Sequence, residues 1–122
     1  MSRPGSAPDP RLARGVAAFN AGDFYEAHEL WEELWNDSEG DTKRAVQALV
    51  QLAAGYHKLE IGVPGGAVKL FARALGILDD VPPAATPLPL DDARAVVRRQ
   101  LVALRASSTT VEAPRLALEP QS

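Results

Sequence analysis

Apolar residues recur every three or four positions along most of the chain, which is the spacing of amphipathic helices. Five segments carry this spacing: 10–21, 23–36, 42–61, 64–80 and 91–105. No segment alternates apolar and polar residues with a period of two, so we expect no sheet. The connections are short, and short connections favour antiparallel neighbours. The pattern predicts an all-α fold: a compact bundle of about five helices, arranged mostly as antiparallel helical hairpins.

Residues that favour helix starts stand at the predicted boundaries. Asp9 places a capping carboxylate before Pro10, and proline suits the first turn of a helix. Asp23 and Glu26 have the spacing of a capping box, with aspartate in the place of the usual serine or threonine. Asp91 is the expected cap of the last helix.

The chain of 122 residues has the length of one domain. We expect a flexible N-terminus over 1–8, a single helical domain over 9–106 and a flexible tail over 107–122. Within the domain, four prolines make 81–90 a Pro-rich linker, because proline disrupts regular structure. In the tail, Leu116 and Leu118 are the residues that could dock on the domain.

Charge and composition exclude several classes of partner. Thirteen Lys and Arg against sixteen Asp and Glu give a net charge of −3, so we expect no nucleic acid, whose binding needs phosphate neutralisation. With no cysteine, the chain has neither disulfides nor a thiolate metal site. It has no apolar run of ~18 residues and no signal-like apolar stretch at its N-terminus, so we expect no membrane association and a cytoplasmic protein. A homo-oligomer or a protein partner remains open.

The sequence contains a faint internal repeat. Four residues reappear later in the chain as residues of similar type, and each is separated from its counterpart by the same number of positions. An apolar residue, a glycine, an alanine and an aromatic residue recur in the same order, as Phe19, Gly22, Ala27 and Trp31 and again as Leu59, Gly62, Ala67 and Phe71. We call the separation between Phe19 and Leu59 the repeat offset. This pattern is typical of one helical hairpin used twice. Two copies are too few for a solenoid, so a compact bundle is the better interpretation.

The segment 23–36 carries the most informative residues. At ~100° per residue, one broad face of this helix is apolar, and it holds Phe24, Ala27, Leu30, Trp31, Leu34 and Trp35. We expect Trp31 in the core, flanked by Phe24 and Leu34. His28 falls at the edge of this face beside Trp35, and Glu32 lies one helical turn further on. Glu29 falls on the opposite, solvated face.

The segment 42–61 contains the second of the two histidines. Its apolar face includes Val50 and Tyr56, and on the helical wheel His57 and Glu60 fall inside the same arc. A glutamate in an apolar arc is unusual, since a buried carboxylate needs a partner. If the two segments pair, the four residues that could converge between them are His28, Glu32, His57 and Glu60.

Three interpretations of this cluster compete. The His–Glu pairs could be hydrogen-bonded groups that fix helix packing. They could form a divalent-metal site, with His28, Glu32, His57 and Glu60 as ligands suited to zinc, manganese, iron or nickel. They could also act in catalysis or ligand binding without a metal. Trp31, Trp35 and Tyr56 are most simply core residues, and a ligand pocket lined by them is the alternative.

The stretch Phe19–Leu78 resembles the bacterial and archaeal domain-of-unknown-function family 309. The resemblance rests on the run from Asn20 to Trp35 (NAGDFYEAHELWEELW), on QALVQLAA at 47–54, on Tyr56-His57 and on Gly66-Ala67. The signature of that family is a histidine, a glutamate four residues later, and a tryptophan or tyrosine three residues after that. His28, Glu32 and Trp35 match it. The resemblance implies an all-α fold of antiparallel helices and a suggested role of this motif in metal binding.

Three functional hypotheses follow. The leading one is a small helical module with a divalent-metal or small-ligand site at His28, Glu32 and Trp35. The second is a metal-dependent hydrolase with Glu32 or Glu60 as general base, which would need a cleft beside the cluster. The third is a protein-interaction scaffold in which the His–Glu cluster is purely structural.

Overall fold

The computed structural model describes residues 9–118, and within this range the chain forms five α-helices, one short 3₁₀ helix and no strand. The elements are α1 (Pro10–Asn20), α2 (Phe24–Asn36), α3 (Gly40–Glu60), α4 (Pro64–Asp80), η1 (Pro83–Ala85) and α5 (Asp91–Arg105). The predicted all-α fold is confirmed, and no helix bound differs from its expected position by more than two residues. The expected flexible N-terminus, 1–8, lies outside the described residues, as do 119–122.

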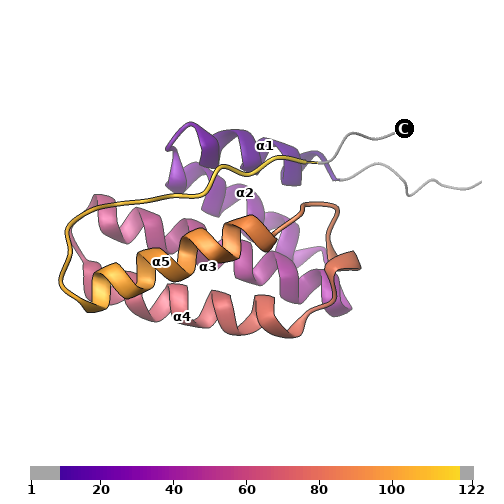
Figure 1. Cartoon of the computed structure of the whole chain (residues 1–122). Coiled ribbons are helices and arrows are strands. Elements are labelled where there is room, and N and C mark those ends of the chain that lie inside the picture. The colour runs from indigo at the N-terminus through magenta and orange to yellow at the C-terminus, as the bar shows by residue number, and fades with distance from the viewer. Residues whose placement is uncertain (1–8, 119–122) are drawn as a thin grey trace, which may run out of the picture.

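Each helix packs against the next one along the chain, and α3 lies at the centre between α2 and α4 (Figure 1). The central position agrees with α3 being the longest helix and having the most buried residues of the five. Its buried residues are Ala45, Val46, Ala48, Leu49, Leu52, Ala53, Gly55 and Tyr56. The sequence prediction of a core tryptophan is confirmed, because Trp31 is fully buried, and the core also contains the buried Leu34 and the partly buried Phe24.

The turns after α1 and after α3 have the same geometry. Gly22 and Gly62, which correspond in the repeat, have φ angles of +82° and +77°, in the left-handed region that glycine adopts without steric cost. In each turn the amide after the glycine donates to a carbonyl five residues earlier, Asp23 to Ala18 at 2.9 Å and Val63 to Lys58 at 2.8 Å. This is the hydrogen-bond pattern of a glycine-terminated helix, and it occurs at both positions of the faint repeat.

Close approach within the two hairpins depends on a glycine facing an aromatic ring. A methyl group on Gly15 would lie 2.5 Å from Cε2 of Trp31, and one on Gly55 would lie 2.5 Å from Cε1 of Phe71. These separations are far below van der Waals contact, so only glycine fits at either position. The two pairs are again related by the repeat offset, and they set the distance between the helices of each hairpin.

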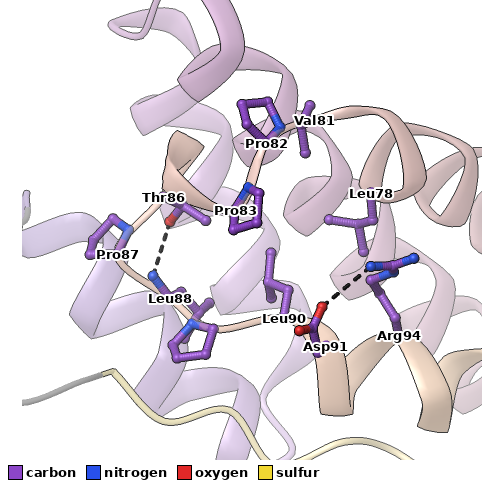
Figure 2. A pocket seen from close by; sticks show the side chains of 11 residues that line it. Leu78, Val81, Pro82, Pro83, Thr86, Pro87, Leu88, Leu90, Asp91 and Arg94 are labelled. Atoms are coloured by element: carbon purple, nitrogen blue, oxygen red, sulfur yellow. Dashed lines mark hydrogen bonds and ion pairs between the residues drawn. The ribbon is translucent and has the colours of Figure 1, made fainter.

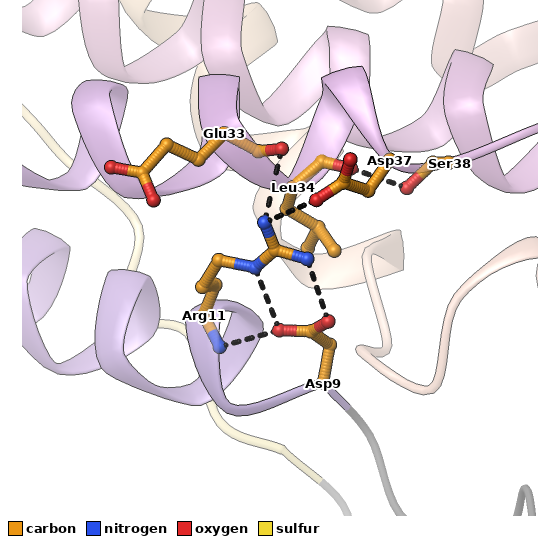
Figure 3. Close-up of polar contacts among 6 residues, drawn as sticks. All are labelled: Asp9, Arg11, Glu33, Leu34, Asp37 and Ser38. Atoms are coloured by element: carbon orange, nitrogen blue, oxygen red, sulfur yellow. Dashed lines mark hydrogen bonds and ion pairs between the residues drawn. The ribbon is translucent and has the colours of Figure 1, made fainter.

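The N-terminus of α1 is joined to the C-terminus of α2 by Arg11 (Figure 3). Asp9 caps α1 as expected, accepting from the Arg11 amide at 2.9 Å. The Arg11 guanidinium also hydrogen-bonds the Asp9 carboxylate, and this contact lowers the pKa of that carboxyl below its usual value. The same guanidinium donates to Asp37 at 2.7 Å and to the Glu33 carbonyl at 3.2 Å.

The segment 81–90, expected to be a Pro-rich linker, is packed against the bundle. Pro83 begins the 3₁₀ helix η1, which is compatible with its fixed φ, and Leu88 is buried. Thr42 of α3 donates to the Ala85 carbonyl at 2.9 Å. Between this segment and the start of α5 lies a hollow of about 190 Å³ (Figure 2).

Two sequence expectations need correction, one about the start of α5 and one about the segment that follows it. Asp91 is the first residue of α5 rather than its cap, and its carboxylate accepts from Arg94 at 3.3 Å. The segment 107–118, expected to be part of a flexible tail, lies along the bundle, with Leu116 buried in the common core. The sequence offered Leu116 as a docking residue, but an extended segment held by side-chain hydrogen bonds has no periodicity, so the path of the segment was not predicted.

Within residues 9–118, no helix combines the length and the apolar character that crossing a bilayer requires.

We predict opposite effects of alanine at two helical glycines. Gly15→Ala should lower the free energy of unfolding by about 1–3 kcal/mol, because the new methyl group would overlap the Trp31 ring. The matched control is Gly76→Ala in α4, where no atom lies within 4 Å of the added methyl group, and it should raise stability by about 0.5–1 kcal/mol. Urea unfolding monitored by circular dichroism measures both. A Gly15→Ala variant as stable as Gly76→Ala would contradict the proposed packing.

Candidate functional site

Helix α2 brings one histidine and two glutamates together on its surface. The capped start of α2 at Asp23, whose side chain accepts from the Glu26 amide at 3.4 Å, sets the register. His28 and Glu32 then lie one turn apart, with Nε2 of the imidazole 4.0 Å from Oε2 of Glu32. The other ring nitrogen, Nδ1, is 3.4 Å from Oε2 of Glu29.

These three side chains form a group that could hold a metal ion. One ligand atom from each of His28, Glu29 and Glu32 lies within 4.8 Å of the others. The carboxylates are about half exposed and the imidazole is 24% exposed, so the group is open to solvent and to a ligand. One imidazole nitrogen and carboxylate oxygens are a donor set suited to zinc, manganese, iron or nickel.

Glu29 was not among the residues that the sequence singled out. The helical wheel assigned it to the solvated face, since its Cα lies about 100° around the axis from that of His28. Its long side chain nevertheless reaches back toward the imidazole. A signal was available, because a glutamate directly beside a histidine has the side-chain length needed to approach it.

The second predicted pair, on α3, lies apart from this group. Nδ1 of His57 is 3.4 Å from Oε1 of Glu60. Glu60, expected inside an apolar arc, is exposed, because it is the last residue of α3 and follows the part of the helix that other helices cover. The helical wheel assigns Glu60 to the apolar face because it does not show that the neighbouring helices stop covering α3 before this residue.

The two histidines nevertheless face a common hollow. The Tyr25 ring lies near both, with centroid distances of 6.3 Å to His28 and 5.4 Å to His57. Tyr25, His28, His57, Ala54 and Lys58 line a hollow of about 200 Å³ between α2 and α3. A site with both histidines as ligands therefore stays a prediction, while the compact group consists of residues of α2.

The three aromatic residues of the predicted ligand pocket occupy different environments. Trp31 is fully buried, and its Nε1 donates to the Leu12 carbonyl at 3.3 Å. Tyr56 is fully buried among core rings, and its hydroxyl donates to the Glu112 carbonyl at 2.6 Å. Trp35 is partly buried and lines a surface hollow of about 180 Å³.

Two residues that line the hollow at Trp35 carry a buried polar atom without a hydrogen-bond partner. Its other lining residues are Glu32, Gln47, Val50 and Gln51. Among the described residues, Nε1 of Trp35 and Oε1 of Gln51 are buried and make no hydrogen bond. Lys43 lies over the Trp35 ring, with Nζ 4.2 Å from the ring centroid.

Comparisons with known proteins agree with the resemblance noted in the sequence. Residues 12–70 match the family model described as Domain of unknown function (DUF309). A protein of Aquifex aeolicus (strain VF5), described as an uncharacterized protein, is 29% identical over 91 residues. That alignment covers 74% of this chain and 27% of the relative, so the chain spans about a quarter of the relative's length. Both histidines and the acidic residues around them lie inside the matched segment.

The burial of Tyr56 makes a prediction about alkaline pH. Burial, with a smaller contribution from Glu112, raises the pKa of Tyr56 above the ordinary value of 10.0. Above pH 10 the unfolded chain therefore loses this proton while the folded chain keeps it. Stability that is complete below pH 10 is lost as the pH rises.

The measurement is urea unfolding between pH 8 and pH 11 for the wild type and Tyr56→Phe. By pH 11 the wild type should lose about 1 kcal/mol more than the variant, since one proton accounts for about 1.36 kcal/mol per pH unit. The comparison cancels the titration of lysines and of Tyr25, which both proteins share. Parallel pH curves would contradict the assignment.

Proposed function

Since residues 12–70 match the DUF309 family model, whose description assigns no activity, we propose a function from geometry: a divalent-metal site formed by His28, Glu29 and Glu32. The observation that carries the proposal is the separation of the three ligand atoms, all within 4.8 Å of one another. Two ligands bound to one ion at about 2.0–2.2 Å lie about 3.4 Å apart in tetrahedral geometry. Small rotations of the exposed glutamate side chains would bring the ligand atoms from within 4.8 Å of one another to this separation.

The donor set also sets limits on the chemistry. Three protein ligands leave at least one coordination position open, which is the arrangement of metal sites that bind water or substrate. The hollow beside His28, lined by Tyr25 and His57, could receive such a ligand. In this arrangement Glu32 serves as a ligand rather than as a general base, and Glu60 pairs with His57. Because the two glutamates considered as general bases then have other contacts, a binding module is the first proposal and a hydrolase is the alternative.

The repeat provides an internal argument for a specific role. In the second hairpin, the positions that correspond to His28, Glu29 and Glu32 by the repeat offset are Val68, Lys69 and Ala72. A hairpin of the same construction thus packs without any His–Glu cluster. This observation favours a function for the cluster over a purely structural role in helix packing.

Calorimetric titration with zinc and with manganese tests the site. Wild-type protein should bind one ion, and His28→Ala should abolish binding. At a metal concentration 100 times Kd, binding should stabilise the wild type by about 2.7 kcal/mol, which for a domain of this size is a rise in Tm of several degrees. Glu32→Gln should weaken binding at least tenfold while leaving the fold unchanged, because the side chain is exposed.

The matched control is His57→Ala, which removes the other partly buried histidine and its contact with Glu60. It should bind metal like the wild type. Loss of binding in both histidine variants would instead favour the two-histidine site expected from the sequence. Equal thermal shifts in the wild type and His28→Ala would reject a specific metal site.

A second candidate function has its own observation. Trp35 and Gln51, whose Nε1 and Oε1 atoms are buried without a hydrogen-bond partner, line one hollow with Glu32. A buried donor and acceptor without partners lose free energy, and a ligand restores part of it when the two side chains turn toward the hollow. A planar carboxamide offers the complementary pair, a carbonyl for the indole N–H and an amino group for the glutamine oxygen. We therefore propose carboxamide-containing small molecules as ligands of this hollow.

Titration with nicotinamide, followed by ¹H–¹⁵N NMR, tests this second site. The chain contains two tryptophans, so it gives two indole N–H signals. The Trp35 signal should shift in a saturable manner, whereas the Trp31 signal should stay, because that N–H already donates to Leu12. Gln51→Leu should remove the response. Equal movement of both signals, or none at all, would exclude the carboxamide site.

A further inference from the structure

The segment after α5 occupies a groove across the bundle, and we call residues 107–118 the C-terminal strap. It leaves the end of α5 and runs back beside α1 in extended form (Figure 1). The groove is formed by residues from three helices that are distant in sequence, namely Asn20 of α1, Tyr56 of α3 and Gln100 of α5. The strap has no helix or strand of its own.

Two side-chain carboxamides hold the strap by its backbone. Asn20 donates to the Leu116 carbonyl at 2.7 Å and accepts from the Leu116 amide at 2.8 Å. Gln100, which is 1% exposed, donates to the Thr110 carbonyl at 3.1 Å and accepts from the Glu112 amide at 2.5 Å. Each carboxamide therefore satisfies both a donor and an acceptor of an extended main chain. Such contacts do not depend on the identity of the side chains that the bound segment carries.

Three side chains of the strap add selectivity. Glu112 accepts from Arg99 at 2.8 and 3.2 Å, and the interaction lowers the pKa of this carboxyl. Pro114 and Leu116 are buried, and Leu116 is only 2% exposed. The groove thus selects an extended segment with an acidic residue, then a proline two positions later and a leucine after two more. The recognised pattern is Glu-x-Pro-x-Leu.

The strap fills this groove incompletely. Beside Ala113, Pro114 and Arg115 lies a hollow of about 320 Å³, whose opposite wall includes Phe19 and Phe24. Alanine is too small to fill such a space, and a larger apolar residue at the same position would bury more surface against the two rings. The chain's own segment therefore leaves room for a larger side chain at the position of Ala113.

The strap is also built in a way that favours release. Its first residue, Ser107, has a φ of +64°, a left-handed conformation that is strained for serine. Few of its side chains are buried, which is typical of segments that open before the rest of a structure. Asn20 and Tyr56 lie inside the family segment 12–70, whereas the strap lies outside it. The matched segment thus contributes part of the groove, and Arg99 and Gln100 of α5 contribute the rest.

We propose that this groove binds, in trans, an extended segment of another protein with the pattern Glu-x-Pro-x-Leu, and that the strap competes with it from within the chain. The mode of recognition is that of an extended peptide whose main chain supplies affinity and whose alternate side chains supply specificity. The acidic residue is matched by Arg99 and the leucine by the site that Leu116 now occupies. The inference is independent of metal binding at His28.

Fluorescence anisotropy with a labelled synthetic peptide tests the proposal. The peptide has the sequence of residues 108–118 (STTVEAPRLAL), and the receptor is the full chain carrying Leu116→Asp, which weakens the internal strap and leaves the groove unchanged. The peptide should bind this variant at least tenfold more tightly than the wild type, whose strap competes. A peptide with leucine at the position of Ala113 should bind several-fold more tightly again.

Controls separate groove binding from other effects. Asn20→Ala in the Leu116→Asp background should weaken binding at least tenfold, and a peptide with aspartate at the position of Leu116 should not bind. If Leu116→Asp impairs folding, as circular dichroism would reveal, Glu112→Lys replaces it, because it reverses an exposed contact with Arg99.

Equal binding to wild-type and strap variants, or binding unaffected by Asn20→Ala, would overturn the proposal. The proposal would also be overturned if the wild-type chain forms dimers as its concentration rises and the dimer does not bind the peptide. That result would assign the groove to the strap of a second copy. Light scattering coupled to size exclusion distinguishes this case from a monomeric receptor.

Discussion

The bundle depends on a glycine that lies beneath an aromatic ring in each of its two hairpins. Gly15 faces Trp31 between α1 and α2, and Gly55 faces Phe71 between α3 and α4. Because both rings are fully buried, the helices must approach closely enough to exclude water from them. Any larger side chain at the glycine would separate the helices and open a gap around the ring. The remaining core is assembled around these two contacts.

The two contacts are related by the same repeat offset as the glycine turns. The correspondence extends to Ala27 and Ala67, both completely buried where neighbouring helices approach. The molecule can therefore be described as one hairpin used twice, with α5 and the C-terminal strap added along one side. The polar group at His28 is then a departure from the repeat. Solvent exposure of α2 explains why this face is polar, but exposure alone does not bring an imidazole between two carboxylates.

How much of this was predictable differs between helices and extended segments. Helical periodicity and capping residues predicted all five helices, and the arc of α2 identified Trp31 as a core residue, because burial of one helix face leaves a direct pattern in the sequence. Glu60 was misplaced because a wheel does not show where the covering helices end. The sequence offered Leu116 as a docking residue of the strap. The hydrogen bonds that hold the strap were missed because Asn20 and Gln100 bind main-chain atoms 96 and 10 residues away, and such contacts leave no periodic signal.

The aromatic core also explains why the two proposed sites should act independently. Tyr56 contacts the strap and His57, the next residue, lines the hollow beside His28, so consecutive residues of α3, about 100° apart around its axis, serve different sites. Phe19, Phe24 and Phe71 pack around the Tyr56 ring at centroid distances of 4.7 to 5.7 Å. Coupling between distant sites needs an element with two arrangements that both ligands favour differently. A tightly packed ring cluster supported by Gly55 offers no second arrangement, so we expect metal at His28 to leave peptide affinity unchanged.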